Sequence, residues 1–216
     1  MEKLVSVKCP KELEPIFLRA EKQVKEFFAN QEHDPTKAIR TISGDRYMLV
    51  RAEVLGYWIR KVAEKIYGTE GTDVLVYEFG KAIGRSDAKG SHEKFGLKQP
   101  DERLGPGPIH FNYSGFAFVE LLPESHPSPD DDYLLVYNHP HSFEAEMQLK
   151  MKGKSKICVC NLTAGYSAGW CEESYGIKLD AEEIACIAKG DKNCQFVMAP
   201  PDKLRDYVKR YLEEIM

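Results

Sequence analysis

The sequence predicts an α+β fold in which an antiparallel sheet packs against several helices. Segments with apolar residues at helical spacing occur at 11–31, 51–67 and 201–216. Two runs rich in aromatic residues, 109–122 and 132–139, are separated by a loop and are typical of strands. Because 43% of the 216 residues are hydrophobic, the chain can bury a core of its own.

The first helix is predicted over residues 11–31, with one apolar face. Residues 40–52 follow, where a Gly-Asp turn precedes an apolar run and leaves the local structure ambiguous. A second helix over 51–67 ends before Gly68, a residue that often stops helices. The apolar face of the first helix comprises Ile16, Leu18, Val24, Phe27 and Phe28.

A third helix is predicted over residues 72–88. Gly80 and Gly84 lie four residues apart on one face of it, which permits close approach of a neighbouring element. Residues 97–108 contain three prolines and two glycines and are expected to form a loop. The aromatic runs that follow, 109–122 and 132–139, are expected to form two strands.

The last third of the chain alternates helices with a hairpin. A short helix is predicted over 142–152 with Ser142 as its N-cap, and a helix rich in small residues over 157–175. Residues 177–200 predict a hairpin that turns at KGDKN, and a closing helix follows over 201–216.

Composition and motifs exclude several classes of function. The net charge of −4 and the absence of a basic recognition helix argue against direct nucleic-acid binding. No apolar run is long enough for a membrane helix, and the first residues do not resemble a signal peptide, so a cytoplasmic protein is expected. The sequence has no P-loop, dinucleotide fingerprint, nucleophile elbow or HExxH motif, so an enzyme is not expected.

Five of the six cysteines fall between positions 158 and 194, which indicates metal binding or reactivity in a reducing compartment. The predicted hairpin brings Cys186 and Cys194 together, and Cys160 precedes the small-residue helix. Glu183 lies three residues before Cys186, so joint ligation requires a bulge or an early strand end. Cys160, Glu183, Cys186 and Cys194 are candidate ligands of a closed tetrahedral Zn²⁺ site. Alternatively, these are buried packing cysteines, or Cys158 or Cys171 replaces one ligand.

The same residues resemble the vinyl-4-reductase domain family. The string CNLTAGYSAGW, the string AEEIACIAKGDKNC, the segment HSFEAEM and the helix YEFGKAIGRSDA are similar to its motifs, over roughly residues 75–200. The arrangement resembles the effector-sensing domain of xylene- and phenol-responsive sigma-54 activators. The resemblance implies a fold shared with vesicle-tethering subunits, a structural zinc at the four candidate ligands that clamps the C-terminal hairpin, and a homodimer.

Aromatic residues on the two predicted strands and the small-residue helix could wall an apolar cavity. The candidate ligand-binding residues are Phe111, Tyr137, His139, Tyr166 and Trp170. Phenol-sensing members of the family hold the phenolic oxygen with a His and a Trp, and those positions align near Phe111 and His139. His110 is one residue away and would face the opposite side of a strand. The resemblance therefore implies an effector other than phenol.

These observations predict a single sensory domain over residues 1–200 and a C-terminal exit helix over 201–216. The domain comprises a helical and aromatic-strand part, 1–140, and a vinyl-4-reductase-like part, 141–200, that carries the metal site. The expected function is regulatory: the domain binds a hydrophobic or aromatic effector and relays this to an ATPase, kinase or DNA-binding output module outside this chain. The alternatives are a tetrapyrrole-binding protein or enzyme related to vinyl reduction, and a scaffold protein without a cavity.

Overall fold

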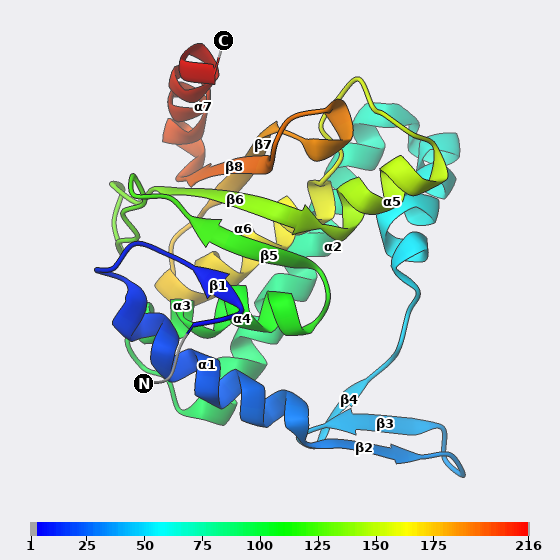
Figure 1. The fold of residues 1–216 in the computed structure, drawn as a ribbon, viewed down its shortest axis with the longest axis vertical. Helices are drawn as coiled ribbons and strands as arrows, with labels where there is room; N and C mark the ends of the chain where they lie inside the picture. Colours follow the sequence, from blue (N-terminus) through cyan, green and yellow to red (C-terminus); the bar gives the residue numbers. More distant parts are fainter. Residues whose placement is uncertain (1–3, 216) are drawn as a thin grey trace.

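The computed structural model describes residues 4–215, which form a five-stranded sheet, a three-stranded sheet and the helices around them (Figure 1). The order of the larger sheet is β1-β5-β6-β8-β7, and its pairs are antiparallel except for β1 with β5. The predicted α+β class is confirmed. Residues 1–3 and Met216, at the ends of the predicted domain and exit helix, lie outside the described part. The strands are β1 (Val7–Lys8), β5 (Ala117–Leu121), β6 (Leu135–Ser142), β7 (Asp180–Ala185) and β8 (Cys194–Ala199).

The N-terminal part begins with helix α1 (Glu14–Ala29), as the sequence predicts. Ile16 and Leu18, which the sequence places on the apolar face of this helix, are only half-buried. Phe17, which lies between them in the sequence, is fully buried. The ambiguous segment 40–52 belongs to the smaller sheet, which lies apart from the larger one in Figure 1. Its strands are β2 (Gln31–Asp34), β3 (Ile39–Ile42) and β4 (Asp45–Tyr47).

The two helices predicted over 51–67 and 72–88 are joined in one long segment. A turn of π-helix, η1 (Val54–Trp58), leads into α2 (Ile59–Phe95). Gly68 interrupts α2 with φ 71° and ψ −178°, a conformation that glycine adopts without steric cost. The sequence therefore predicts the break and most of the helix on both sides of it correctly, but not residues 69–71 and 89–95, which also belong to α2.

The loop predicted over 97–108 is wrong, because two short helices form there: α3 (Pro100–Leu104) and α4 (Pro106–Tyr113). Both begin at a proline, where the missing N–H costs nothing. Gln99 and Glu102 form a capping box at the start of α3. The strand predicted from residue 109 is consequently wrong as far as Tyr113, and β5 begins only at Ala117.

The C-terminal part follows the predicted order of elements. Ser142 precedes α5 but makes no capping hydrogen bond, because its Oγ lies 3.4 Å from Cys160 Sγ instead. The small-residue helix begins at residue 161, later than predicted, and the predicted hairpin is formed by β7 and β8 with a turn of 3₁₀-helix between them. The helices of this part are α5 (Phe143–Met151), α6 (Asn161–Tyr175), η2 (Ile187–Lys189) and α7 (Pro201–Ile215).

The larger sheet separates two apolar layers. Tyr137 on β6 and its cross-strand partner Phe196 on β8 belong to the main core, together with residues of α4 and α6. Their neighbours Val136 and Val197 point to the other face and pack under α7. In Figure 1, α6 lies below the sheet and α7 above it. Within residues 4–215, no helix is long and apolar enough to cross a membrane.

Candidate functional site: a four-residue metal centre beside an aromatic cavity

The structure brings together the four residues that the sequence singles out as candidate metal ligands. Cys160 immediately precedes α6, Glu183 lies on β7, Cys186 follows β7, and Cys194 is the first residue of β8. One donor atom from each lies within 4.8 Å of the others. Cys160, Cys186 and Cys194 are almost completely buried, so the cluster could hold a metal ion away from solvent.

Glu183 and Cys186 reach the same cluster because β7 is irregular between them. The register of the β7–β8 pair shifts between Glu183 and Ala185, and the strand ends at Ala185. A regular strand would have placed two residues three apart on opposite faces. The predicted bulge and the early strand end are therefore both present.

The spacing of the sulfur atoms fits tetrahedral coordination. The Cys160 and Cys194 Sγ atoms are 3.6 Å apart, and the Cys194 and Cys186 Sγ atoms are 3.9 Å apart. A tetrahedron with metal–sulfur bonds of about 2.3 Å has edges of about 3.8 Å. Glu183 uses Oε2 to accept a hydrogen bond from the Cys160 backbone N–H at 2.8 Å. Its Oε1 is buried without a partner, as expected of an oxygen that a cation would bind.

Crowding of four acidic groups perturbs their protonation. Burial raises the pKa of the Glu183 carboxyl to about 8 and that of the Cys160 thiol well above its usual range. Hydrogen bonds from the Cys160 and Cys194 thiols hold the pKa of the Cys186 thiol far below its usual range. One thiolate supported by protonated neighbours is the arrangement expected of a cation site, because a divalent ion lets all four groups ionise at neutral pH.

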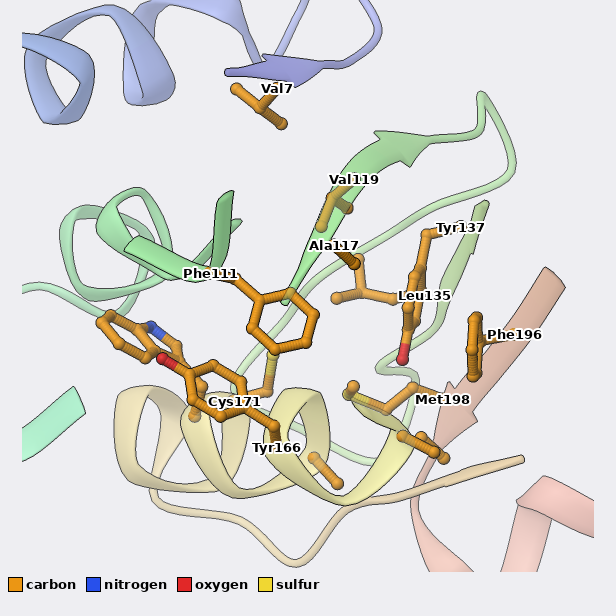
Figure 2. Close-up of a cluster of buried hydrophobic side chains, with 14 of the residues drawn as sticks. Val7, Phe111, Ala117, Val119, Leu135, Tyr137, Tyr166, Cys171, Phe196 and Met198 are labelled. Carbon is orange, nitrogen blue, oxygen red and sulfur yellow. The ribbon is translucent and has the colours of Figure 1, made fainter. Parts of the chain in front are cut away.

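An apolar cavity of about 40 Å³ lies between the larger sheet and helices α4 and α6. Figure 2 shows Phe111 and Tyr166 facing each other there, with Tyr137 and Met198 on the sheet side. No charged side chain lines it among the described residues. The lining residues are Leu104, Gly107, Pro108, Phe111, Val119, Leu121, Leu135, Tyr137, Tyr166, Ser167, Trp170, Cys171 and Met198.

Four of the five residues predicted to bind a ligand line this cavity: Phe111, Tyr137, Tyr166 and Trp170. The fifth, His139, is fully buried but is not among the lining residues. Its ring lies 5.6 Å from that of Phe111 and 4.5 Å from that of Phe196, and neither ring nitrogen has a hydrogen bond. Burial lowers the pKa of His139 to about 3, so the ring is neutral.

His110 and Phe111 lie on helix α4, so the prediction that they occupy opposite faces of a strand is wrong. Both are buried. The His110 ring belongs to a polar network behind the cavity, where its Nδ1 lies 3.1 Å from the Tyr166 hydroxyl and its Nε2 lies 3.3 Å from the Tyr47 hydroxyl. The Tyr166 hydroxyl donates to Asp87 Oδ2 at 3.1 Å. This network fixes the orientation of Tyr166, whose ring lies 4.4 Å from that of Phe111.

The sequence reasoning missed the part of the cavity wall formed by Leu104, Gly107 and Pro108, because it assigned that segment to a loop. The prolines at the first positions of α3 and α4 were the available signal. Gly107 matters here because a Cβ atom would lie 2.7 Å from Trp170 Nε1. The indole is also held by a hydrogen bond from Nε1 to the Arg103 carbonyl oxygen, at 3.0 Å.

The chain is similar to part of one curated regulator. No family model matches the chain. The phenol regulator MopR of Acinetobacter guillouiae is 28% identical over 157 residues, which are 72% of this chain. The chain corresponds to only 28% of that regulator's length.

One solved structure shares the fold. The phenol-responsive sensory domain of the transcription activator PoxR, solved with phenol, has a TM-score of 0.74 at 20% identity, and the match covers 89% of this chain and 94% of that domain. A trafficking protein particle complex subunit 3 from Naegleria fowleri, covalently bound to palmitic acid, has a TM-score of 0.46 at 12% identity, covering 68% and 93%. The predicted resemblance to sensory domains of phenol-responsive activators is therefore confirmed, and these relatives are regulators and not enzymes. The vinyl-4-reductase name itself has no matching family model.

Proposed function

We propose that this chain is a cytoplasmic sensing domain that binds a small hydrophobic or aromatic effector and relays its presence to an output partner. One observation carries the proposal: a buried cavity with aromatic walls lies in a chain with the fold of a phenol-responsive sensory domain. Phe111, Tyr166 and Trp170 form the helix side of the proposed effector site and Tyr137 the sheet side, with His139 behind Phe111.

The size of the cavity limits what it accepts. An apolar cavity that holds benzene measures about 150 Å³, whereas this one measures about 40 Å³. A single aromatic ring can therefore enter only if side chains move, and the unbranched side chain of Met198 is the most adaptable of those that line the cavity. A tetrapyrrole macrocycle is far larger, so the tetrapyrrole alternative is not proposed.

The structural change caused by effector binding is proposed to reach the output partner through the larger sheet. Tyr137 and Phe196 face the cavity side of the sheet, and their neighbours Val136 and Val197 contact the layer under α7. A ring that enters beside Tyr137 would displace β6, and α7 rests on the opposite face of the same strands. The exit helix 201–216 is therefore the proposed connection to an output module such as an ATPase, a kinase or a DNA-binding unit.

The metal is proposed to be a structural Zn²⁺. Three thiolates and one carboxylate at tetrahedral spacing match the ligands that Zn²⁺ prefers, and four protein donors leave no position open for a substrate. Bound there, the ion supplies a cross-link and no chemistry: Cys160 ties the start of α6 to the β7–β8 hairpin through Glu183, Cys186 and Cys194. None of the six cysteines forms a disulfide, so the three cysteine ligands are available to a metal ion.

A homodimer is proposed because one helix face is apolar and uncovered. Val54, Trp58, Val62 and Ile66 follow one another at intervals of four residues along η1 and α2, and their side chains are 42–66% exposed. Single exposed apolar residues are common, but a continuous stripe of this kind is typical of an interface. A straight stripe on one helix can pair with its own copy across a twofold axis, which makes a second chain the proposed partner.

Native mass spectrometry of freshly purified protein tests this function. The expected result is a dimer with one zinc ion per chain, and an additional small organic molecule that dissociates on mild activation. Protein that retains zinc but carries no small molecule, and that shows no mass shift in saturating ethylbenzene or benzyl alcohol, would contradict the sensing function.

A further inference from the structure

Buried polar atoms without partners gather on one face of β6. Among the residues that the structure describes, six buried side-chain nitrogen or oxygen atoms have no hydrogen bond. Four of the six belong to Tyr133, Tyr137 and His139. Tyr137 and His139 share a face of β6 with Leu135, because alternate residues of a strand point to the same side, and Tyr133 lies just before the strand. Three of these four unpaired polar atoms therefore lie on the side of this strand that faces the cavity.

Of these three residues, only Tyr137 lines the cavity described above. Figure 2 shows the hydroxyl of Tyr137 pointing from β6 toward the helix that carries Tyr166. Ser167 also lines the cavity and is close enough to act on the Tyr137 hydroxyl, but it does not satisfy that hydroxyl as a hydrogen-bond partner. The ring of His139 lies 5.3 Å from that of Tyr137, which places it next in the row.

Native proteins rarely leave such atoms unpaired, because a buried donor or acceptor without a partner destabilises the fold. Two other tyrosines of the core follow this rule: the buried Tyr166 hydroxyl pairs with Asp87, and the Tyr175 hydroxyl donates to Asp101 at 3.1 Å. The exception at Tyr137 therefore indicates a partner that is brought from outside the chain.

The charges around the cavity restrict the chemistry of that partner. None of the lining residues is Asp, Glu, Lys or Arg. Burying a carboxylate or an ammonium ion there would leave its charge uncompensated, which is strongly unfavourable. A neutral hydroxyl or carbonyl group, by contrast, finds a hydrogen-bonding hydroxyl at Tyr137 and apolar walls elsewhere.

We infer that Tyr137 is the specificity-determining residue of the cavity, and that the effector is an uncharged ring compound whose hydroxyl or carbonyl oxygen pairs with the Tyr137 hydroxyl. The inference rests on the proposed sensing function and specifies its ligand class. It places the polar contact on β6, and not on the His110 network, whose groups already pair with one another.

Isothermal titration with four matched probes tests this inference: ethylbenzene, benzyl alcohol, benzoate and benzylamine. Benzyl alcohol is expected to bind at least about 10-fold more tightly than ethylbenzene, as a hydrogen bond to a buried group predicts. Benzoate and protonated benzylamine are expected not to bind. In Tyr137→Phe, benzyl alcohol should lose about 10-fold in affinity, while ethylbenzene binds as before.

A melting experiment separates recognition from a merely structural role. Without ligand, Tyr137→Phe should melt at a higher temperature than the natural protein, because an unpaired buried hydroxyl is removed. The matched control is Tyr175→Phe, which removes a hydroxyl that is paired with Asp101 and lies outside the cavity lining. It should melt at a lower temperature and keep the preference for benzyl alcohol.

Two failures are distinguishable. If ethylbenzene binds as tightly as benzyl alcohol, if benzoate binds most tightly, or if Tyr137→Phe keeps the preference, the inference is wrong while the sensing function stands. If none of the four probes binds, the proposed function and the inference fail together.

Discussion

Asp87 is the acidic residue that holds the cavity wall in place. Its Oδ2 accepts the hydrogen bond from the Tyr166 hydroxyl at 3.1 Å and lies 3.8 Å from His110 Nδ1. Burial raises the pKa of the Asp87 carboxyl from 3.8 to about 6. Burial also lowers the pKa of His110 to about 4, so near pH 5 the histidine is neutral and the carboxyl is mostly protonated.

Asp87→Asn is predicted to change the pH dependence of stability. Because the folded-state pKa is raised, the folded protein binds this proton more tightly than the unfolded chain, and the resulting stabilisation is lost as the pH rises from about 4 to about 6. Over this interval the unfolding free energy of the natural protein should fall relative to that of the variant, by at most about 1.4 kcal/mol per pH unit. Urea unfolding at several pH values measures the difference, and parallel curves would contradict the assignment.

Replacement of a single cysteine separates the metal ligands from their neighbours. Cys194→Ser is predicted to abolish stoichiometric zinc binding and to lower the melting temperature, since the proposed ion would link α6 to the hairpin. Cys158→Ser is the control, because Cys158 lies two residues from Cys160 but outside the four-residue cluster. Elemental analysis of both variants should find about one zinc per chain only in the control. Equal zinc in the two proteins would rule out this ligand set.

Spacing in the sequence identified the metal cluster but only part of the cavity. The hairpin and the odd interval between Glu183 and Cys186 required an irregular strand, and the structure has one. The face of His110 could not be inferred in the same way, because that inference assumed a strand where a helix forms. The direction of a side chain depends on whether its residue lies in a helix or in a strand. Predicting a strand where a helix forms therefore also gives the wrong direction for the side chain.

At the scale of elements, the contact between α2 and α6 depends on glycines in both helices. A Cβ atom at Gly84 would lie 2.1 Å from the Tyr166 carbonyl oxygen, and one at Gly165 would lie 2.0 Å from the Tyr77 carbonyl oxygen. No side chain can be accommodated at such distances. The backbones therefore touch directly, and α6 is held in register with the cavity and the metal cluster at the same time.

Gly84→Ala is predicted to destabilise the protein by more than about 3 kcal/mol, because the helices must separate and leave voids in the core. Gly90→Ala is the matched control on the same helix, since nothing lies within 4 Å of a Cβ atom there. It should leave stability unchanged or raise it by about 0.5–1 kcal/mol through helix propensity. Chemical denaturation compares the two, and similar unfolding free energies would refute the close-contact explanation.

Elements with a strong periodic pattern were predictable, and short elements were not. Helices α1 and α7 and the β7–β8 hairpin follow from apolar spacing and turn residues, whereas α6 is predicted from its run of small residues. Strands β2 and β4 of the smaller sheet are polar and mostly exposed, and β3 has apolar residues only at its two ends, so none of the three shows hydrophobic alternation. Helices α3 and α4 are each shorter than three turns and are fixed by proline positions and by packing against α1 and α6.

At the scale of the whole molecule, the larger sheet lies between the proposed sensing site and the proposed exit. The cavity and the metal cluster share α6, because Cys160 precedes this helix and Tyr166 and Trp170 lie within it. On the other face, Val208 and Tyr211 of α7 pack on Val136 and Val197. A change at the cavity therefore has one layer of strands to cross before it reaches α7.

Val62→Glu is predicted to convert the proposed dimer into a monomer. Val62 lies in the middle of the exposed apolar stripe and is 57% exposed, so a buried charge at a twofold contact would meet its own copy. Lys89→Glu, on an exposed part of α2 away from the stripe, is the control and should remain dimeric. Analytical ultracentrifugation distinguishes the two masses. A dimeric Val62→Glu protein would exclude this face as the interface.

The central claim, that the cavity binds a small hydrophobic effector, is tested most directly by the fluorescence of Trp170. The chain has two tryptophans. In Trp58→Phe, the tryptophan fluorescence therefore comes from Trp170 alone, which lines the cavity. Titration with benzyl alcohol is predicted to change its emission saturably, with a Kd below about 1 mM. The same titration should have no effect when Leu135→Phe fills the cavity. A flat titration of Trp58→Phe, or an equal response in the filled variant, would contradict the claim.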